Sequence, residues 1–136
     1  TGYQAKIEAV LDGPAIVAHQ QLVRRVGITP PVQDYAVRLV LATHPEGQFA
    51  TPMVNQYFRF GASPRAAQTI VLAAKVRALL DGRGSVATND LKDVAMPALR
   101  HRCLLNFEAE AEGITTDEVI QNAIDTLPTE AVLETS

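Results

Sequence analysis

The stretch Gly61-Ala62-Ser63-Pro64-Arg65-Ala66 opens a long apolar run that ends near Gly82. Proline has a fixed φ that suits the first helical position, and the hydroxyl of Ser63 can accept a hydrogen bond from an unpaired backbone N–H. We therefore expect a helix from Pro64 to Leu80. Its few polar residues are Arg65, Gln68, Thr69, Lys75 and Arg77. Because apolar side chains cover nearly the whole circumference, we expect this helix to be central and buried.

Arg65 is unusual for a helix that needs only to fold. The first turn carries the positive end of the helix dipole, where a cation is unfavourable by a few tenths to about 1 kcal/mol. Free N–H groups at a helix N-terminus and a guanidinium together suit a phosphate. The alternative is an exposed arginine that pairs with an acidic residue of its own domain. Spacing alone leaves both interpretations open.

The composition of the chain favours helices. The chain has 136 residues, of which 47% are hydrophobic, which is enough for one domain with its own core. Aromatic residues make up 5%, tryptophan is absent, and Ala, Leu and Val dominate. Such a composition is typical of closely packed helices rather than of a sheet. We predict an all-α fold, a small bundle of five to six helices with one short extended segment.

Hydrophobic spacing and capping residues place these helices along the chain. We expect them over residues 3–11, 18–26, 29–43 and 64–80, from 88 with a kink or break at Pro97 and a continuation over 99–102, and over 115–127. The third has the clearest amphipathic pattern, and its apolar stripe should pack against the central helix. Asp34 and Arg38 are spaced for an i, i+4 ion pair. Thr88 should cap the fifth helix, and Thr115 with Glu118 reads as a capping box.

Residues 44–60 form the longest stretch without a helical or strand period, which predicts a long connection. Two roles are open for its large side chains, which are Phe49, Met53, Tyr57 and Phe60. They either pin the connection to the core or offer an apolar surface to a partner, and we favour pinning. The last residues, 57–60, should be extended as the chain approaches Gly61.

Disulfide and metal sites find little support in the sequence. Cys103 is a single cysteine, so no internal disulfide can form, and a reducing compartment such as the cytoplasm is the simplest interpretation. His19 lacks a ligand partner at i+3 or i+4. The carboxylates of Glu108, Glu110 and Glu112 alternate without the spacing of a calcium loop, which indicates a solvated face. We expect no metal site.

Charge is distributed unevenly along the chain. The part up to Arg102 contains all twelve Lys and Arg with seven acids, whereas residues 103–136 contain eight acids and no Lys or Arg. We expect the two parts to face each other or different partners. The cluster Arg100-His101-Arg102 should bond carboxylates or backbone carbonyls, and a contact from Arg102 to an adjacent subunit is the weaker alternative. We expect no nucleic-acid partner, because a concentrated basic face and base-stacking aromatics are missing, and no membrane insertion.

The order of the motifs carries a family resemblance. The motifs are Gly61–Ala66, an Ala-rich helix, Gly82-Arg83-Gly84, Val86 with Thr88-Asn89-Asp90-Leu91, and Leu99-Arg100-His101-Arg102. In this order they resemble the C-terminal lid domain of MoxR-type AAA+ ATPases, from about Gly2 to Pro128. The resemblance implies that Arg65 is the sensor 2 residue, which reads the terminal phosphate of ATP. It also implies that Gly61, Ser63 and Pro64 border the nucleotide.

The same resemblance implies a domain organisation and partners. Residues 1–12 would be a linker or first helix after an ATPase core absent from this chain, residues 13–128 the helical lid, and residues 129–136 a tail. The core would bind most of ATP and Mg²⁺. The whole protein would form a ring of six subunits and would assist partners with von Willebrand factor A domains. One departure from the family is His44, where members often carry Arg.

The chain by itself should not hydrolyse ATP. It contains neither the phosphate-binding motif G-x-x-x-x-G-K-[ST], known as Walker A, nor an apolar strand that ends in Asp-Glu, known as Walker B. It also begins in helical-looking sequence without Met, which predicts a piece of a longer protein. The competing hypothesis is a self-contained helical interaction module. In that module the aromatic loop and the acidic C-terminal part would bind a protein, and Arg65 would form a local salt bridge.

Overall fold

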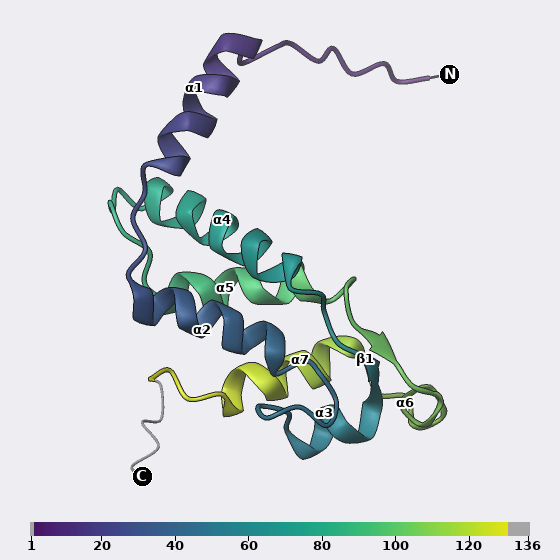
Figure 1. The fold of residues 1–136 in the computed structure, drawn as a ribbon. Helices are drawn as coiled ribbons and strands as arrows, with labels where there is room; N and C mark the ends of the chain where they lie inside the picture. Colours follow the sequence, from purple (N-terminus) through teal and green to yellow (C-terminus); the bar gives the residue numbers. More distant parts are fainter. Residues whose placement is uncertain (1, 131–136) are drawn as a thin grey trace.

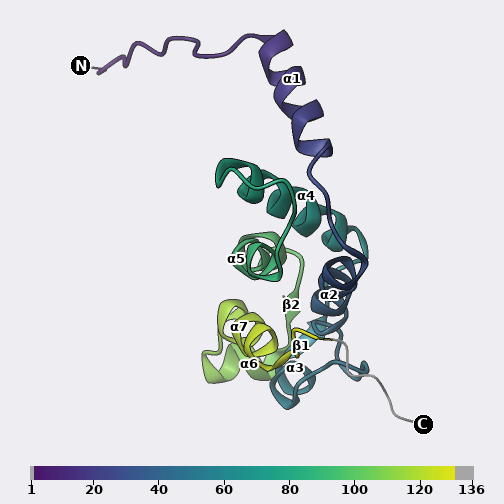
Figure 2. The same cartoon turned by 90° about the vertical axis from the view of Figure 1, so that its left-hand side faces the viewer.

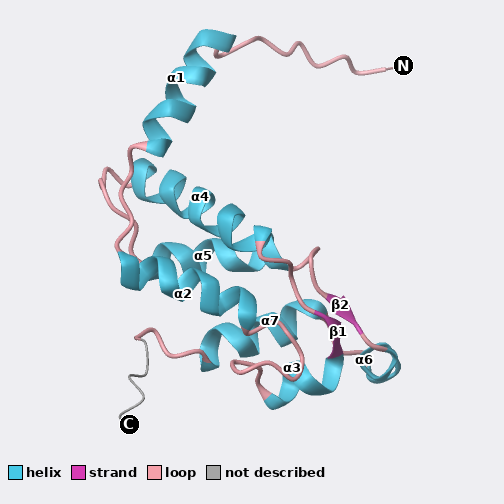
Figure 3. Cartoon of the chain, in the orientation of Figure 1, coloured by secondary structure: helices cyan, strands magenta, loops and turns pink. Residues whose placement is uncertain are grey.

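The computed structural model describes residues 2–130. Within this range the chain forms seven helices and one two-stranded sheet (Figure 1, Figure 3). The elements are α1 (Gly13–Arg24), α2 (Pro30–Leu41), α3 (Pro52–Tyr57), β1 (Phe58–Phe60), α4 (Arg65–Leu80), α5 (Thr88–Leu99), β2 (Leu104–Leu105), α6 (Phe107–Glu112) and α7 (Thr116–Thr126). The predicted all-α class is confirmed. The short extended segment predicted over residues 57–60 is β1, and it begins at Phe58 because Tyr57 is the last residue of α3.

The core is formed by α2, α4 and α5, which pack on one another, and by α7 and α3, which continue it beyond α5. Helices α4 and α5 pack against each other, and α2 contacts both, as predicted for its apolar stripe. Helix α7 contacts α5 and α3, and α3 also contacts α6. Figure 2 shows α4, α5 and α7 stacked in that order, with α2 beside the upper pair. The largest fully buried side chains of the core include Tyr35, Leu39, Ile70, Leu91, Leu99 and Ile120.

Helix α4 buries one face rather than its whole circumference. Its buried residues recur every four positions and are Ala66, Ile70, Ala74 and Ala78. Elsewhere on the helix, Leu72 and Leu80 are 55% and 84% exposed. The expectation of a helix buried on all sides is therefore wrong. The small alanines on this one face let α5 and α2 approach α4 closely.

The N-terminal segment does not form the helix predicted over residues 3–11. The apolar side chains of Tyr3 and Ile7 are 97% and 93% exposed, so they have no surface on which to pack. A helix this short is not stable in water without such a surface. The helical spacing of its apolar residues is therefore not sufficient, and the segment runs outside the bundle without helical structure (Figure 1).

Helix α1 begins earlier than predicted. The carboxylate of Asp12 accepts a hydrogen bond from the N–H of Ala15 at 2.8 Å, which caps a helix that begins at Gly13. The predicted start at residue 18 is therefore wrong, and α1 ends at Arg24 rather than at 26. None of its residues is buried, and it extends away from the bundle beside α4 (Figure 1, Figure 2).

The connection predicted over residues 44–60 contains α3, which the sequence did not indicate. The hydroxyl of Thr51 accepts from the N–H of Val54 at 3.2 Å, and Pro52 follows the cap. The side chains that pack against the core from this segment are Phe49, Met53 and Tyr57. The favoured pinning is confirmed for these three, whereas Phe60 is 58% exposed.

Helix α5 differs from its prediction at both ends. Ala87 rather than Thr88 occupies the N-cap, and the carboxylate of Asp90 accepts from the N–H of Ala87 at 2.7 Å. The helix runs through Pro97 and ends at Leu99, so the predicted continuation to 102 is wrong. Pro97 has no N–H to donate to the carbonyl oxygen of Asp93, and the helix ends two residues later.

The C-terminal part is tied to α2 and begins with the predicted cap. The hydroxyl of Thr115 accepts from the N–H of Glu118 at 3.2 Å, which confirms the capping box of α7. Arg38 donates to Asp34 at 2.8 Å, as predicted, and to the carbonyl oxygen of Thr129 at 3.2 Å. The expected tail starts at this anchored threonine, and its residues 131–136 lie outside the described part of the chain.

Candidate functional site

Arg65 is the first residue of α4 and follows Pro64 directly. Its side chain is exposed, and it forms no ion pair or side-chain hydrogen bond with any of residues 2–130. The local salt bridge of the alternative interpretation is thus not formed in this range. A free guanidinium beside the positive end of a helix favours the approach of an anion.

The turn before Arg65 is closed by backbone groups. Pro64 occupies the N-cap with φ −55° and ψ −25°, and no side chain caps α4. The carbonyl oxygen of Ser63 accepts from the N–H of Ala66 at 2.9 Å, and that of Pro64 accepts from the N–H of Ala67 at 3.1 Å. The predicted cap by the hydroxyl of Ser63 is therefore wrong. Ser63 is instead exposed, next to Arg65.

Gly61 and Ala62 are held against the end of α2. The N–H of Ala62 donates to the hydroxyl of Thr43 at 3.0 Å, and the Nε2 of His44 donates to the carbonyl oxygen of Ala62 at 2.6 Å. A Cβ atom on Gly61 would lie 2.5 Å from the carbonyl oxygen of Thr43. The site therefore includes two residues that sequence reasoning did not assign to it. The glycine was the available signal, since glycine marks places where two backbones approach closely.

The two arginines of the predicted cationic cluster, Arg100 and Arg102, bond to different helices. Arg100 pairs with Asp117 of α7 at 2.8 Å, which joins the basic and acidic parts of the chain. Arg102 donates to a backbone carbonyl of α5 at 3.0 Å and to the hydroxyl of Thr69 at 3.4 Å. The structural role predicted for both arginines is confirmed. Because Thr69 lies one turn after Arg65, the second contact places Arg102 at the same end of α4.

Cys103 lies behind this turn and is buried. Burial raises the pKa of its thiol to about 11, while hydrogen bonds that involve Thr43 and Ala62 act in the opposite direction. The thiol is therefore neutral near pH 7, and a thiol rather than a thiolate is a poor nucleophile. Cys103 contributes packing behind the site rather than covalent chemistry.

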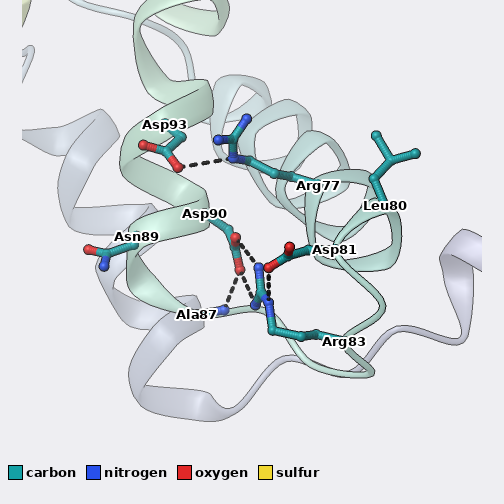
Figure 4. A pocket seen from close by; sticks show the side chains of 8 residues that line it. All are labelled: Arg77, Leu80, Asp81, Arg83, Ala87, Asn89, Asp90 and Asp93. Carbon is teal, nitrogen blue, oxygen red and sulfur yellow. Dashed lines mark hydrogen bonds and ion pairs between the residues drawn. The ribbon is translucent and has the colours of Figure 1, made fainter.

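A separate hollow lies at the turn between α4 and α5 (Figure 4). Its walls include Arg77, which pairs with Asp93 at 2.9 Å, and Arg83, which pairs with Asp81 at 2.8 Å. Arg83 also makes a two-pronged contact with the buried carboxylate of Asp90. Each of these two guanidinium groups already has a carboxylate partner in the same chain. The hollow thus lacks a free charge for an anionic ligand, in contrast to Arg65.

Residues 2–130 offer no metal centre and no membrane-spanning helix. Within residues 2–130, no three His, Cys, Asp or Glu side chains come together as metal ligands. The glutamates Glu108, Glu110 and Glu112 of α6 are all exposed, which confirms the predicted solvated face. Every helix in this range is too short or too polar to cross a membrane.

Known proteins of one family resemble this chain in sequence and fold. The family described as the AAA lid domain matches residues 51–123, which is more than half of the chain. Chaperone MoxR1 of Mycobacterium tuberculosis is 31% identical over 140 residues, which cover 84% of this chain and 37% of that protein. Protein MoxR of Paracoccus denitrificans is 36% identical over 75 residues, or 54% of this chain and 22% of its own.

A solved structure shows the same arrangement of helices. The crystal structure of a candidate ATPase from Cytophaga hutchinsonii superposes with a TM-score of 0.80 at 32% sequence identity, over 85% of this chain and 35% of that one. The chain thus spans between about a fifth and just over a third of the length of these relatives. The resemblance drawn from the motifs is confirmed, and the chain belongs to the AAA lid domain family, as a lid of the MoxR type.

Proposed function

We propose that this lid closes over ATP held by an ATPase core of the same polypeptide, and that Arg65 acts as sensor 2. In the closed state the guanidinium neutralises charge on the γ-phosphate. Hydrolysis and phosphate release remove that contact, so the nucleotide state becomes motion of the lid relative to the core. The whole protein is then an ATPase that uses this motion to remodel or mature partner proteins.

One observation carries this proposal. Arg65 stands exposed in the first turn of a sixteen-residue helix, and it has no anionic partner in residues 2–130. Its charge there costs the isolated lid a little stability, and an arriving phosphate reverses the sign of that effect. Gly61, Ser63 and Pro64 form the turn in front of the guanidinium, and they border the nucleotide in this proposal.

The competing interaction module has less support. It needs a local partner for Arg65, and it needs the large side chains of residues 44–60 at the surface. Within the described range Arg65 has no such partner, and Phe49, Met53 and Tyr57 pack against the core. We therefore prefer a role in which the free cation has a ligand outside the lid.

The partners of the whole protein follow from its family in this proposal. The core binds ATP and Mg²⁺, the subunits form a ring-shaped hexamer, and the partners carry von Willebrand factor A domains. Light scattering of the full-length gene product, with and without ATPγS and Mg²⁺, tests the ring. A closed hexamer with nucleotide supports it, whereas a monomer under both conditions contradicts it.

Turnover of ATP by the full-length gene product tests the role of Arg65. Removing one charge-stabilising donor from a reacting centre typically lowers kcat about a hundredfold, and we expect Arg65→Ala to do so. Arg65→Lys should restore part of the rate, because it keeps the charge but loses the planar fork. Arg77→Ala is the matched control, since it removes a guanidinium from the same helix at its other end.

The comparison also has a clear negative outcome. If Arg65→Ala left both ATP turnover and ATP-dependent assembly at the wild-type level, the sensor role would be wrong. Equal losses in Arg65→Ala and Arg77→Ala would likewise contradict it, because they would indicate a general effect of charge on α4.

A further inference from the structure

We infer that Thr43 and His44, which follow the end of α2, are positioning residues for Arg65. The inference rests on the proposed sensor role, because it concerns how the same guanidinium is aimed. Neither residue touches the nucleotide in this account. They act by fixing the backbone of Ala62, three residues before Arg65.

The hydroxyl of Thr43 is held in one orientation. It donates its proton to the carbonyl oxygen of Val40 at 2.6 Å, within the last turn of α2. Its lone pair is therefore free to accept the N–H of Ala62 at 3.0 Å. Thr43 is 1% exposed and Ala62 fully buried, so water cannot replace either bond.

His44 secures the other polar group of the same residue. A carbonyl oxygen can only accept, so the Nε2 of His44 carries the proton and donates to the oxygen of Ala62 at 2.6 Å. Two consecutive side chains thus bond the N–H and the C=O of one peptide residue. The direction of the chain at Ala62 is set by both bonds together.

Gly61 brings the two segments close enough for these bonds. A Cβ atom at this position would lie 2.5 Å from the carbonyl oxygen of Thr43 and 2.6 Å from Cδ2 of His44. Both distances are far below any normal contact, so the close approach requires glycine. The end of α2 and the turn before α4 are therefore packed without a gap.

Beyond Ala62, no side chain fixes the turn. Ser63 and Pro64 are exposed, and α4 has no side-chain cap. The orientation of the first turn of α4 is therefore set by the bonds at Ala62 on one side and by the packing of Ala66 on the other. Loosening Ala62 should leave α4 folded but let the direction of Arg65 vary.

The experiment measures nucleotide discrimination by the full-length gene product. The readout is the ratio of the dissociation constants for ADP and ATPγS, because a sensor of the γ-phosphate changes this ratio and a general loss of stability does not. The variants are Thr43→Val, which removes the hydroxyl and with it the bonds to Val40 and Ala62, and His44→Leu, which removes the donor to Ala62. His44→Gln is the conservative variant, since its amide can still donate to the carbonyl of Ala62.

Thr51→Val provides a matched control for Thr43→Val. Thr51 is also a buried threonine, and its hydroxyl likewise accepts one backbone N–H and donates one hydrogen bond, here to Asn122 at 2.7 Å. It lies at the start of α3 rather than beside Ala62. Its loss should lower the melting temperature about as much but leave nucleotide discrimination unchanged.

The expected result is a loss of about tenfold in the ADP/ATPγS ratio for Thr43→Val and His44→Leu, the effect of one well-placed hydrogen bond. His44→Gln should recover most of it. In combination with Arg65→Ala, either variant should cause no further loss, because both act through the same guanidinium. If Thr43→Val fails to fold, the His44 pair decides the matter.

Two negative results differ in meaning. If Arg65→Ala lowers the ratio but Thr43→Val and His44→Leu match Thr51→Val, the positioning role is overturned and the sensor role stands. If Arg65→Ala itself leaves the ratio unchanged, the proposed function fails, and the inference about Thr43 and His44 fails with it.

Discussion

At the scale of single residues, Arg65 differs from the arginines that hold the lid together. Arg38, Arg83 and Arg100 each bond a carboxylate of the same domain. Arg65 is exposed and has no such partner within residues 2–130, although it stands where a helix favours an anion. Its charge therefore does not stabilise the lid, and this is the reason to propose a ligand for it.

Gly61 offers the most direct test of the packing behind Arg65. Gly61→Ala should lower the free energy of unfolding by about 2 kcal/mol or more, because the added methyl overlaps the backbone of Thr43. Gly84→Ala is the control, since a Cβ atom there meets nothing within 4 Å, and it should change stability by less than about 1 kcal/mol. Urea titrations of the two variants measure the difference, and equal effects would show that the close approach is not real.

At the scale of elements, the turn between α4 and α5 depends on Asp90. Its buried carboxylate accepts two bonds from Arg83 and one from the N–H of Ala87 at 2.7 Å. The bond from Arg83 is the main reason that the pKa of Asp90 is lowered in the folded chain, although burial opposes it. The motif Gly82-Arg83-Gly84 therefore has a structural role, because its arginine links the end of α4 to the first turn of α5.

Asp90→Asn should weaken the link between Arg83 and α5, and its effect on the free energy of unfolding should depend on pH. A carboxyl group with a lowered pKa in the folded state stabilises the protein above its unfolded pKa and loses that effect as pH falls through the folded value. At pH 7 the variant should be less stable by about 2 kcal/mol. The difference should begin to shrink below about pH 4, near the unfolded pKa of an aspartate, and should close as pH falls through the lower folded pKa. A constant difference down to pH 2 in urea titrations would refute the assignment.

Helix α1 is the element least supported by the lid. It has no buried residue, its contacts are with α4, and Ile16, Val17 and Leu22 are all close to half exposed. We expect the amide protons of residues 16–24 to exchange at least about a hundredfold faster than those in the middle of α4 in this chain alone. Hydrogen exchange read by mass spectrometry measures both helices. Comparable protection would mean that α1 packs more firmly than its burial indicates.

At the scale of the whole molecule, the fold class and most long helices follow from local patterns. The spacing of apolar residues in α2 and the box at Thr115 predict their helices well, because both signals act within a few residues. The helix predicted over residues 3–11 failed, since its stripe has nothing to pack on. Helix α3 was missed because its six residues are too few to show a helical period.

The candidate site was predictable in part. Arg65 stood out in the sequence because its charge conflicts with the helix dipole, which is a local property. Thr43 and His44 lie about twenty residues earlier, and their bonds to Ala62 depend on how α2 meets the turn before α4. Local sequence patterns carry no information about such tertiary contacts. Gly61 was the one sequence signal of a close backbone approach at this point, but it could not show that Thr43 and His44 are the residues approached.

The most direct test of the account is a structure of the full-length gene product with ATPγS and Mg²⁺ bound. We predict that the lid is closed over the nucleotide and that a guanidinium nitrogen of Arg65 lies about 3 Å from a γ-phosphate oxygen. An occupied nucleotide site with Arg65 turned to solvent, or bonded to a carboxylate of its own lid, would contradict the central claim.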